Sequence, residues 1–183
     1  MNSVDLLQAA GAGDVAELAR LMDSGCDPNV VHPMTGATAL YNACVGGRVD
    51  VVRLLLQRGA DPNKRITYHS PVDGRIESGL VALMVASSPE VAALLLDAGA
   101  DPSVRDDAGR TVLMRLVGAA PSKTFDFLIR AGADPAARGN DGRSAADLVQ
   151  EKLAWWLRFA PTKNPEHQQE LQQILALVQS KRP

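Results

Sequence analysis

The stretch Gly59-Ala60-Asp61-Pro62 decides the fold of this chain, because nearly the same four-residue pattern occurs four times. The other copies begin at Gly25, Gly99 and Gly132, so successive copies are 34, 40 and 33 residues apart. An apolar cluster with helical spacing precedes each copy. Gly favours the left-handed conformation that follows a helix, Asp accepts hydrogen bonds from turn amides, and Pro prevents the helix from resuming. The pattern therefore predicts four helices that each end at this helix-stop sequence.

A second pattern lies upstream in each unit and predicts where another helix begins. Residues 36–40 read Gly-Ala-Thr-Ala-Leu, and related stretches start at Gly79, Gly109 and Gly142. In three of the four, a Thr or Ser two residues after the Gly can cap a helix. Each unit is thus predicted to be a turn, a helix, a short loop, a second helix and a helix stop.

Together these residues resemble the ankyrin-repeat family, whose repeat is about 33 residues long. The clearest match is residues 36–63, and the resemblance covers residues 4–150. It implies an all-α solenoid of helix-turn-helix repeats, joined by short hairpin fingers that each run from a helix stop to the next helix start. We expect one domain, residues 1–183, with repeats at residues 1–30, 31–64, 65–104, 105–138 and 139–160 and a C-terminal capping helix at residues 164–180.

The chain departs from the family pattern at two positions of each first helix. Where the family usually has Pro, this chain has Ala39, Ala82, Val112 and Ala145. Where the family usually has His, it has Tyr41, Met84, Met114 and Asp147. The resemblance implies that this His supplies hydrogen bonds between repeats. We therefore expect those bonds to be missing and the individual repeats to be less stable.

The tail after residue 150 predicts two helical segments separated by a break at residues 161–165. The second helix starts with Pro165 and places Leu171, Ile174, Leu175 and Val178 on one face. A repeat array needs a cap at its apolar end, and the alternative is a helix that docks into another protein. Trp155 and Trp156 are adjacent and cannot face the same way. One is expected to seal the core, and the other to be a surface anchor or to pack under the final helix.

Composition excludes several classes of protein. The 183 residues are 46% hydrophobic, 22% charged and 4% aromatic, with a formal net charge of −2. Such a chain is too apolar for intrinsic disorder and lacks the basic charge of a nucleic-acid or anionic-membrane binder. We find no continuous 18-residue apolar run. We expect a cytoplasmic protein with no nucleic-acid or membrane partner, in which Cys26 and Cys44 are small core residues rather than a disulfide.

No group of residues with catalytic or metal-binding spacing stands out. His32, His69 and His167 are far apart in the sequence, and there is no phosphate-binding glycine loop. The carboxylate pair Asp106 and Asp107 lies at a predicted turn, where the first is expected to bond the turn amides and the second to be solvated. The sequence therefore predicts no cofactor, no metal and no enzyme activity.

The third finger differs from the others in length. Asp61 and Gly79 are 18 residues apart, whereas the other fingers span 8 or 9 residues. Residues 66–77 place β-branched and aromatic side chains on both sides of a Pro-Val-Asp-Gly turn, which predicts a long hairpin. The longer finger is either a recognition element or the result of sequence drift that the fold tolerates. The same repeat lacks three residues between its helices, near the Ser88-Pro89-Glu90 helix start, so one or both helices should be short.

These features predict a protein that binds another protein and is a monomer when free. By register with the family's variable positions, the expected contacts lie on the fingers and first helices. They are Met34, Thr35, Tyr41, Asn42, Val45, Tyr68, His69, Arg75, Glu77, Met84, Asp107, Arg110, Met114, Arg115, Asn140, Asp141 and Arg143. Two roles remain open: an inhibitor such as a bacterial immunity-type protein that neutralises a toxin, and a scaffold or host-directed effector that recruits a client protein.

Overall fold

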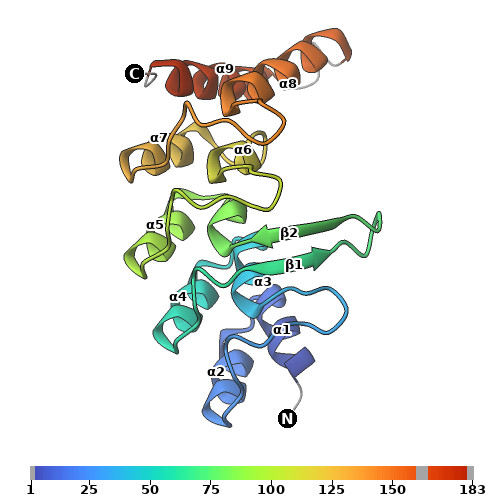
Figure 1. Cartoon of the computed structure of the whole chain (residues 1–183). Helices are drawn as coiled ribbons and strands as arrows, with labels where there is room; N and C mark the ends of the chain where they lie inside the picture. The colour runs from blue at the N-terminus through green and yellow to red at the C-terminus, as the bar shows by residue number, and fades with distance from the viewer. Residues whose placement is uncertain (1–2, 160–164, 181–183) are drawn as a thin grey trace. The chain divides into compact units, whose positions relative to one another are not determined.

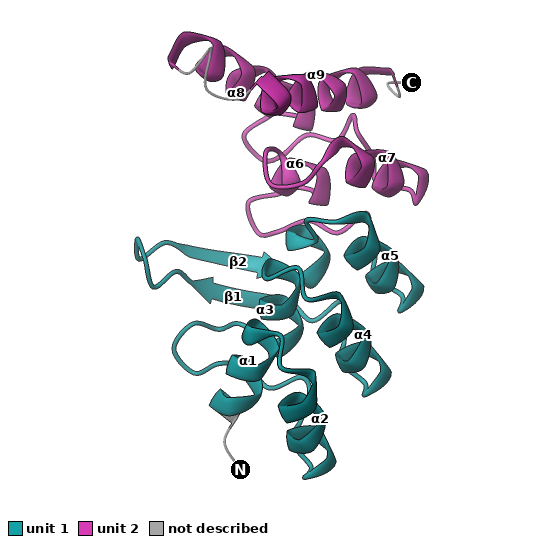
Figure 2. Cartoon of the chain, turned by 180° about the vertical axis from the view of Figure 1, so that it is seen from behind, with its two compact units in different colours: residues 1–101 teal, residues 102–183 magenta. Residues whose placement is uncertain are grey.

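The computed structural model describes residues 3–159 and 165–180 and is predominantly helical (Figure 1). The chain divides into two compact units, residues 1–101 and residues 102–183, called unit 1 and unit 2 below (Figure 2). Unit 1 contains α1 (Ser3–Ala12), α2 (Val15–Asp23), α3 (Ala39–Val45), α4 (Val49–Gln57), β1 (Ile66–His69), β2 (Ile76–Leu80), the 3-10 helix η1 (Ala82–Val85) and α5 (Pro89–Asp97). Unit 2 contains α6 (Val112–Leu116), α7 (Ser122–Arg130), α8 (Ala145–Phe159) and α9 (Pro165–Ser180). The predicted all-α class is confirmed.

All four predicted helix stops are present. Helices α2, α4, α5 and α7 each end two residues before the Gly of the stop sequence, and these glycines have φ between +86° and +105°. At the second stop the Gly59 amide donates to the Leu56 carbonyl (3.1 Å) and the Ala60 amide donates to the Leu55 carbonyl (2.9 Å). The Asp61 carboxylate then accepts from the Asn63 amide at 2.8 Å. The helix therefore ends because each of these groups has a specific hydrogen-bonding partner.

The helix starts confirm the predicted caps and show which helix is short. The Thr38 hydroxyl accepts from the Tyr41 amide (3.2 Å), and Thr111 and Ser144 cap their helices in the same way. The third repeat has Val81 at this position, with no side-chain cap bond, and its first helix is only the four-residue η1. Its second helix keeps nine residues and is capped by Ser88, whose hydroxyl accepts from the Val91 amide. The missing residues thus shorten the first helix alone.

Unit 1 is built from two rows of helices. Figure 2 shows α1 and α3 side by side in one row and α2, α4 and α5 in the other, and η1 packs on α3. Leucines such as Leu18, Leu40 and Leu83 fill the core between the rows. Cys44 is also buried, which raises the pKa of its thiol to about 12, and Cys26 is half-buried. Both cysteines are free, and the prediction of a core position is confirmed for Cys44 but not for Cys26.

The third finger forms the predicted hairpin, with β1 and β2 antiparallel. Tyr68 pairs with Glu77 and His69 with Ile76. The hairpin lies against the second finger, where the His69 amide donates to the Thr35 carbonyl at 2.8 Å. At Gly36, with φ +72°, an added Cβ would lie 1.8 Å from the Thr67 carbonyl oxygen. The close approach of these two fingers therefore requires glycine at position 36.

Two asparagines, which the sequence analysis missed, link successive helix stops in unit 1. The Asn63 side-chain amide donates to the Gly99 carbonyl (2.8 Å), and its oxygen accepts from the Asp101 amide (2.9 Å). Asn29 makes the same pair of bonds one repeat earlier, at 2.9 and 2.7 Å. These bonds differ from those that the family His would supply, and they join successive repeats at the helix stops.

Unit 2 ends in the predicted final helix. Helix α9 begins at Pro165 and packs on α7 and α8, and it buries Leu171, Ile174 and Val178 while Leu175 is half-buried. This packing is what a cap requires. The predicted break lies mostly in residues 160–164, outside the described residues. Trp156 is half-buried, with its ring centroid 5.0 Å from that of His167 on α9, and Trp155 is exposed. Neither tryptophan is fully buried, so the prediction that one seals the core is wrong.

Candidate functional site

Unit 1 contains a hollow of about 300 Å³ beside the third finger. Helix α1, the second finger, α3 and β1 supply its walls, and its lining residues are Leu7, Gln8, Gly11, Ala12, His32, Thr35, Asn42 and Tyr68. Sequence reasoning predicted three of them, Thr35, Asn42 and Tyr68. It missed the α1 residues because that helix precedes the first helix stop and carries no helix-start pattern.

The polar groups of the unit 1 hollow are held in place by local hydrogen bonds and ring packing. The Nδ1 atom of His32 accepts from the Met34 amide (3.2 Å) and the Thr35 amide (3.1 Å), which fixes the imidazole against the second finger. The ring of Tyr68 lies 5.4 Å from that of Tyr41, centroid to centroid. No Asp, Glu, Lys or Arg lines this hollow. It can therefore accept an apolar or neutral polar side chain, by packing and hydrogen bonding.

Apolar side chains are exposed along the hairpin and on other segments of unit 1. Val72, at the hairpin turn, is 93% exposed, and Ile76 on β2 is 62% exposed. Met34 on the second finger and Val45 at the end of α3 are exposed as well. Between the two strands, Arg75 and Asp73 form an ion pair. Hydrogen bonds from the Ser70 side chain and the Arg75 backbone, together with Arg75 itself, lower the pKa of Asp73 to about 2.

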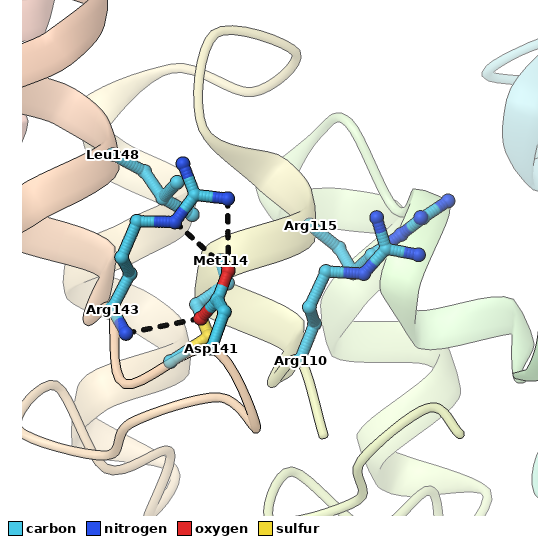
Figure 3. A pocket seen from close by; sticks show the side chains of 6 residues that line it. All are labelled: Arg110, Met114, Arg115, Asp141, Arg143 and Leu148. Atoms are coloured by element: carbon cyan, nitrogen blue, oxygen red, sulfur yellow. Dashed lines mark hydrogen bonds and ion pairs between the residues drawn. The ribbon is translucent and has the colours of Figure 1, made fainter. Parts of the chain in front are cut away.

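Unit 2 contains a smaller hollow of about 170 Å³ that is rich in arginine (Figure 3). It lies between the fourth and fifth fingers and the helices α6 and α8, and is lined by Arg110, Met114, Arg115, Asp141, Arg143 and Leu148. Five of these residues were predicted as partner contacts. Leu148 was missed because a single Leu in a helix normally indicates a core residue.

Acidic side chains orient the arginines of the unit 2 hollow. The fully buried carboxylate of Asp106 accepts from Nε of Arg110 at 2.7 Å and lies 4.0 Å from Arg115. As predicted, Asp106 also bonds turn amides, those of Ala108 (3.0 Å) and Arg110 (2.8 Å). On the other side, Arg143 contacts Asp141 at 2.8 Å (Figure 3). Hydrogen bonds from the Arg143 backbone and side chain lower the pKa of Asp141.

The fourth and fifth fingers are joined directly. The Asn140 amide donates to the Ala108 carbonyl (3.2 Å), and the Asn140 side chain donates to the Asp107 carbonyl (3.4 Å). The Arg105 guanidinium adds bonds to the carbonyls of Gly109 (2.9 Å) and Arg138 (2.7 Å). These contacts hold the loop that carries Asp141 in a defined place.

Three predicted contact residues are buried within the chain. Met84 is 1% exposed, Met114 is 5% exposed and Tyr41 is 6% exposed. Their assignment as surface contacts is therefore corrected, although Met114 still touches the floor of the unit 2 hollow. Each of the three residues lies three positions after the N-cap residue of its helix, where other side chains of the protein cover it. They were predicted to be exposed only because the matching family positions are variable surface positions.

The other predicted residues remain accessible. Those that are exposed are Met34, Val45, His69, Arg75, Asp107, Asn140, Asp141 and Arg143. Those that are half-buried are Thr35, Asn42, Tyr68, Glu77, Arg110 and Arg115. Those up to Glu77 lie in unit 1, and those from Asp107 onward lie in unit 2.

Within residues 3–159 and 165–180, no three His, Cys, Asp or Glu side chains gather closely enough to hold a metal ion. In the same part of the chain, we find no helix that combines the length and the apolar character needed to cross a bilayer.

Comparison with known proteins identifies the repeats. The family described as "Ankyrin repeats (3 copies)" matches residues 6–106, just over half of the chain. The chain belongs to the ankyrin-repeat family. The helix stops, helix starts and fingers described above are thus parts of ankyrin repeats, which generally mediate protein–protein interaction and are generally not enzymes.

Similar proteins share only parts of their length with this chain. The 2-5A-dependent ribonuclease of Mus musculus is 45% identical over 60 residues, which is 33% of this chain and 8% of that protein. Ankyrin repeat and SOCS box protein 6 of Mus musculus is 33% identical over 120 residues, or 63% of this chain and 26% of that protein. The mitochondrial disaggregase of Bos taurus is 32% identical over 137 residues, or 59% and 20%. The chain thus matches about a quarter or less of each relative.

Proposed function

We propose that this chain binds a partner protein through the third finger and the adjoining hollow of unit 1. The observation that carries the proposal is the hairpin itself, which is about ten residues longer than the other fingers and exposes Val72 (93%) and Ile76 (62%). Apolar side chains gain stability when a partner removes them from water, at roughly 25 cal/mol per Å². Family membership supports the same proposal, because ankyrin repeats generally bind proteins.

The third finger is held in place by hydrogen bonds, and this favours a role in recognition over tolerated sequence drift. Strand pairing between β1 and β2 and the His69–Thr35 hydrogen bond hold the hairpin before any partner arrives. A preformed surface loses less conformational entropy on association than a flexible loop does. Tyr68 adds a large side chain with few rotatable bonds at the edge of the hollow, which is a common feature of residues that dominate binding energy.

Binding alone can produce either of two effects on the partner. An inhibitor, such as an immunity-type protein that neutralises a toxin, would cover the partner's active surface. A scaffold or host-directed effector would hold a client and leave its activity intact. We propose inhibition as the first role to test and recruitment as the alternative. Capture of the partner from the native cell, followed by an assay of its activity with and without this chain, separates the two.

Two variants test the finger. In the first, Val72→Ser and Ile76→Ser remove the exposed apolar groups while the strand pairing stays. In the second, residues 66–75 are replaced by a short glycine-containing turn of ordinary finger length. The matched control is Val15→Ser, an exposed valine on α2 in the other row of helices. Circular dichroism checks that each variant is folded.

We expect each finger variant to weaken binding of the captured partner at least about tenfold, which corresponds to about 1.4 kcal/mol. The control should bind normally. Unchanged affinity of the folded finger variants would overturn the proposal and leave the finger as an elaborated loop without a binding role.

A further inference from the structure

We propose that the arginine hollow of unit 2 binds an acidic side chain of the partner, a Glu or Asp that stands next to an aliphatic residue. This inference rests on the proposed function, because it names the chemistry of the partner segment. Of the four charged side chains that line the hollow, three are arginines, Arg110, Arg115 and Arg143, and one is acidic, Asp141. The lining therefore complements a negative group.

The arginines are already oriented for such a group. Asp106 holds Arg110 at 2.7 Å and lies 4.0 Å from Arg115, and its own side chain is fully buried. Because Asp106 has no exposed surface, it positions the two guanidinium groups without presenting its own oxygens to a ligand. A guanidinium carries five N–H donors, so one that already pairs with a carboxylate can bond a second one.

The opposite wall sets the place of the carboxylate within the hollow. Figure 3 shows Asp141 and Arg143 together on one side and Arg110 with Arg115 on the other. The incoming carboxylate would be repelled by Asp141 and Glu151, which both pair with Arg143, at 2.8 and 3.0 Å. It is therefore expected at the side of Arg110 and Arg115.

The size and floor of the hollow define the rest of the ligand. Its volume is about 170 Å³, below the roughly 300–1,000 Å³ of pockets that enclose whole small molecules. A hollow of this size suits one or two side chains of a protein segment. Met114 and Leu148 give it an apolar part, which fits an aliphatic residue next to the acidic one.

The test uses a defined probe and does not require the natural partner. The acidic peptide acetyl-Leu-Glu-Leu-Glu-amide is titrated into the isotope-labelled full chain, with acetyl-Leu-Gln-Leu-Gln-amide as the uncharged control and inorganic phosphate as a competing anion. The signals followed are the backbone amides of residues 105–116 and 139–149 and the arginine Nε–H groups. Variants Arg110→Gln and Arg115→Gln are compared with Arg130→Gln, an exposed arginine on α7 outside the hollow.

We expect the acidic peptide to shift these signals with a Kd of about 1 mM or below, the range open to a short peptide held by few contacts. The affinity should fall at least about fivefold in Arg110→Gln or Arg115→Gln, because each loses one ion pair to the peptide, and stay unchanged in Arg130→Gln. Two variants are used so that one that fails to fold does not decide the outcome.

Several results would overturn the inference. They are equal binding of the glutamine peptide, shifts confined to residues outside the hollow, tighter binding of phosphate than of the acidic peptide, and no shift at all. Each of these leaves the third-finger proposal standing, because that proposal is tested with the captured partner and with variants in unit 1.

Discussion

Gly36 and Gly59 form a natural pair for testing how the third finger is held. Both have positive φ, +72° at Gly36 and +86° at Gly59, so replacement by Ala forces a side chain into the left-handed region at either site. Their surroundings differ. An added Cβ at Gly59 meets nothing within 4 Å, whereas at Gly36 it would lie 1.8 Å from the Thr67 oxygen and 2.9 Å from its carbonyl carbon.

The expected costs follow from this difference. Gly59→Ala should lower the free energy of unfolding only by the cost of placing a residue with a Cβ in the left-handed conformation, about 1 to 2 kcal/mol. Gly36→Ala has the same conformational cost and also forces β1 away from the second finger. That movement breaks the hydrogen bond from the His69 amide to the Thr35 carbonyl, worth about 0.5–1.5 kcal/mol. We therefore expect Gly36→Ala to cost at least about 1 kcal/mol more than Gly59→Ala.

Urea denaturation followed by circular dichroism measures both free energies, and backbone amide spectra report on the hairpin. In Gly36→Ala the amide signals of His69 and Ser70 should move, while in Gly59→Ala they should stay in place. Equal destabilisation by the two substitutions, with the hairpin signals unchanged in both, would refute the reasoning. It would mean that the contact between the fingers contributes nothing to stability.

Three further outcomes are expected. Asn63→Ala should lower the free energy of unfolding by about 1–2 kcal/mol, because it removes two hydrogen bonds, while Lys64→Ala changes it little; equal effects in urea denaturation would argue against the link. Above pH about 9 the unfolded Cys44 thiol ionises and the folded one, whose pKa is about 12, does not. Stability should therefore fall as the pH rises from about 9 toward 12, and this slope should be weaker in Cys44→Ala. A chelator should leave the melting temperature unchanged, since the described residues contain no metal-binding cluster, and a fall of several degrees would contradict this.

The elements that could be predicted from the sequence are those fixed by local chemistry. The helix stop at Gly59 needs only a residue that tolerates positive φ and a following Pro, so the pattern locates it directly. The Thr38 cap and the Ser88-Pro89 helix start are equally local. The hairpin could be predicted at residues 66–77 because β-branched and aromatic residues lie on both sides of a Pro-Val-Asp-Gly turn; its second strand extends to Leu80.

Features that depend on contacts between repeats could not be predicted in this way. The bonds of Asn63 reach residues 36 and 38 positions away, and no short pattern in the sequence indicates them. The burial of Met84 likewise depends on the neighbouring repeats, so register alone misplaced it. Arginine side chains were predicted at the fingers, but their gathering into one hollow follows from Asp106, whose buried carboxylate orients two of them.

The two units join their repeats by different means, and this bears on how each would bind a partner. In unit 1 the links are Asn29 and Asn63 at the helix stops, and the third finger touches its neighbour mainly near Gly36. The hairpin tip, with Val72 exposed, is thus left available. In unit 2 the positions that match these asparagines are Ser103 and Ala136, neither of which has a side-chain amide, and Arg105 and Asn140 join the fingers. Those bonds tie the loop that carries Asp141 and Arg143 to the neighbouring finger. Unit 1 thus offers apolar side chains on a hairpin, whereas unit 2 offers arginines that neighbouring carboxylates orient, so variants in the two units probe chemically distinct contacts.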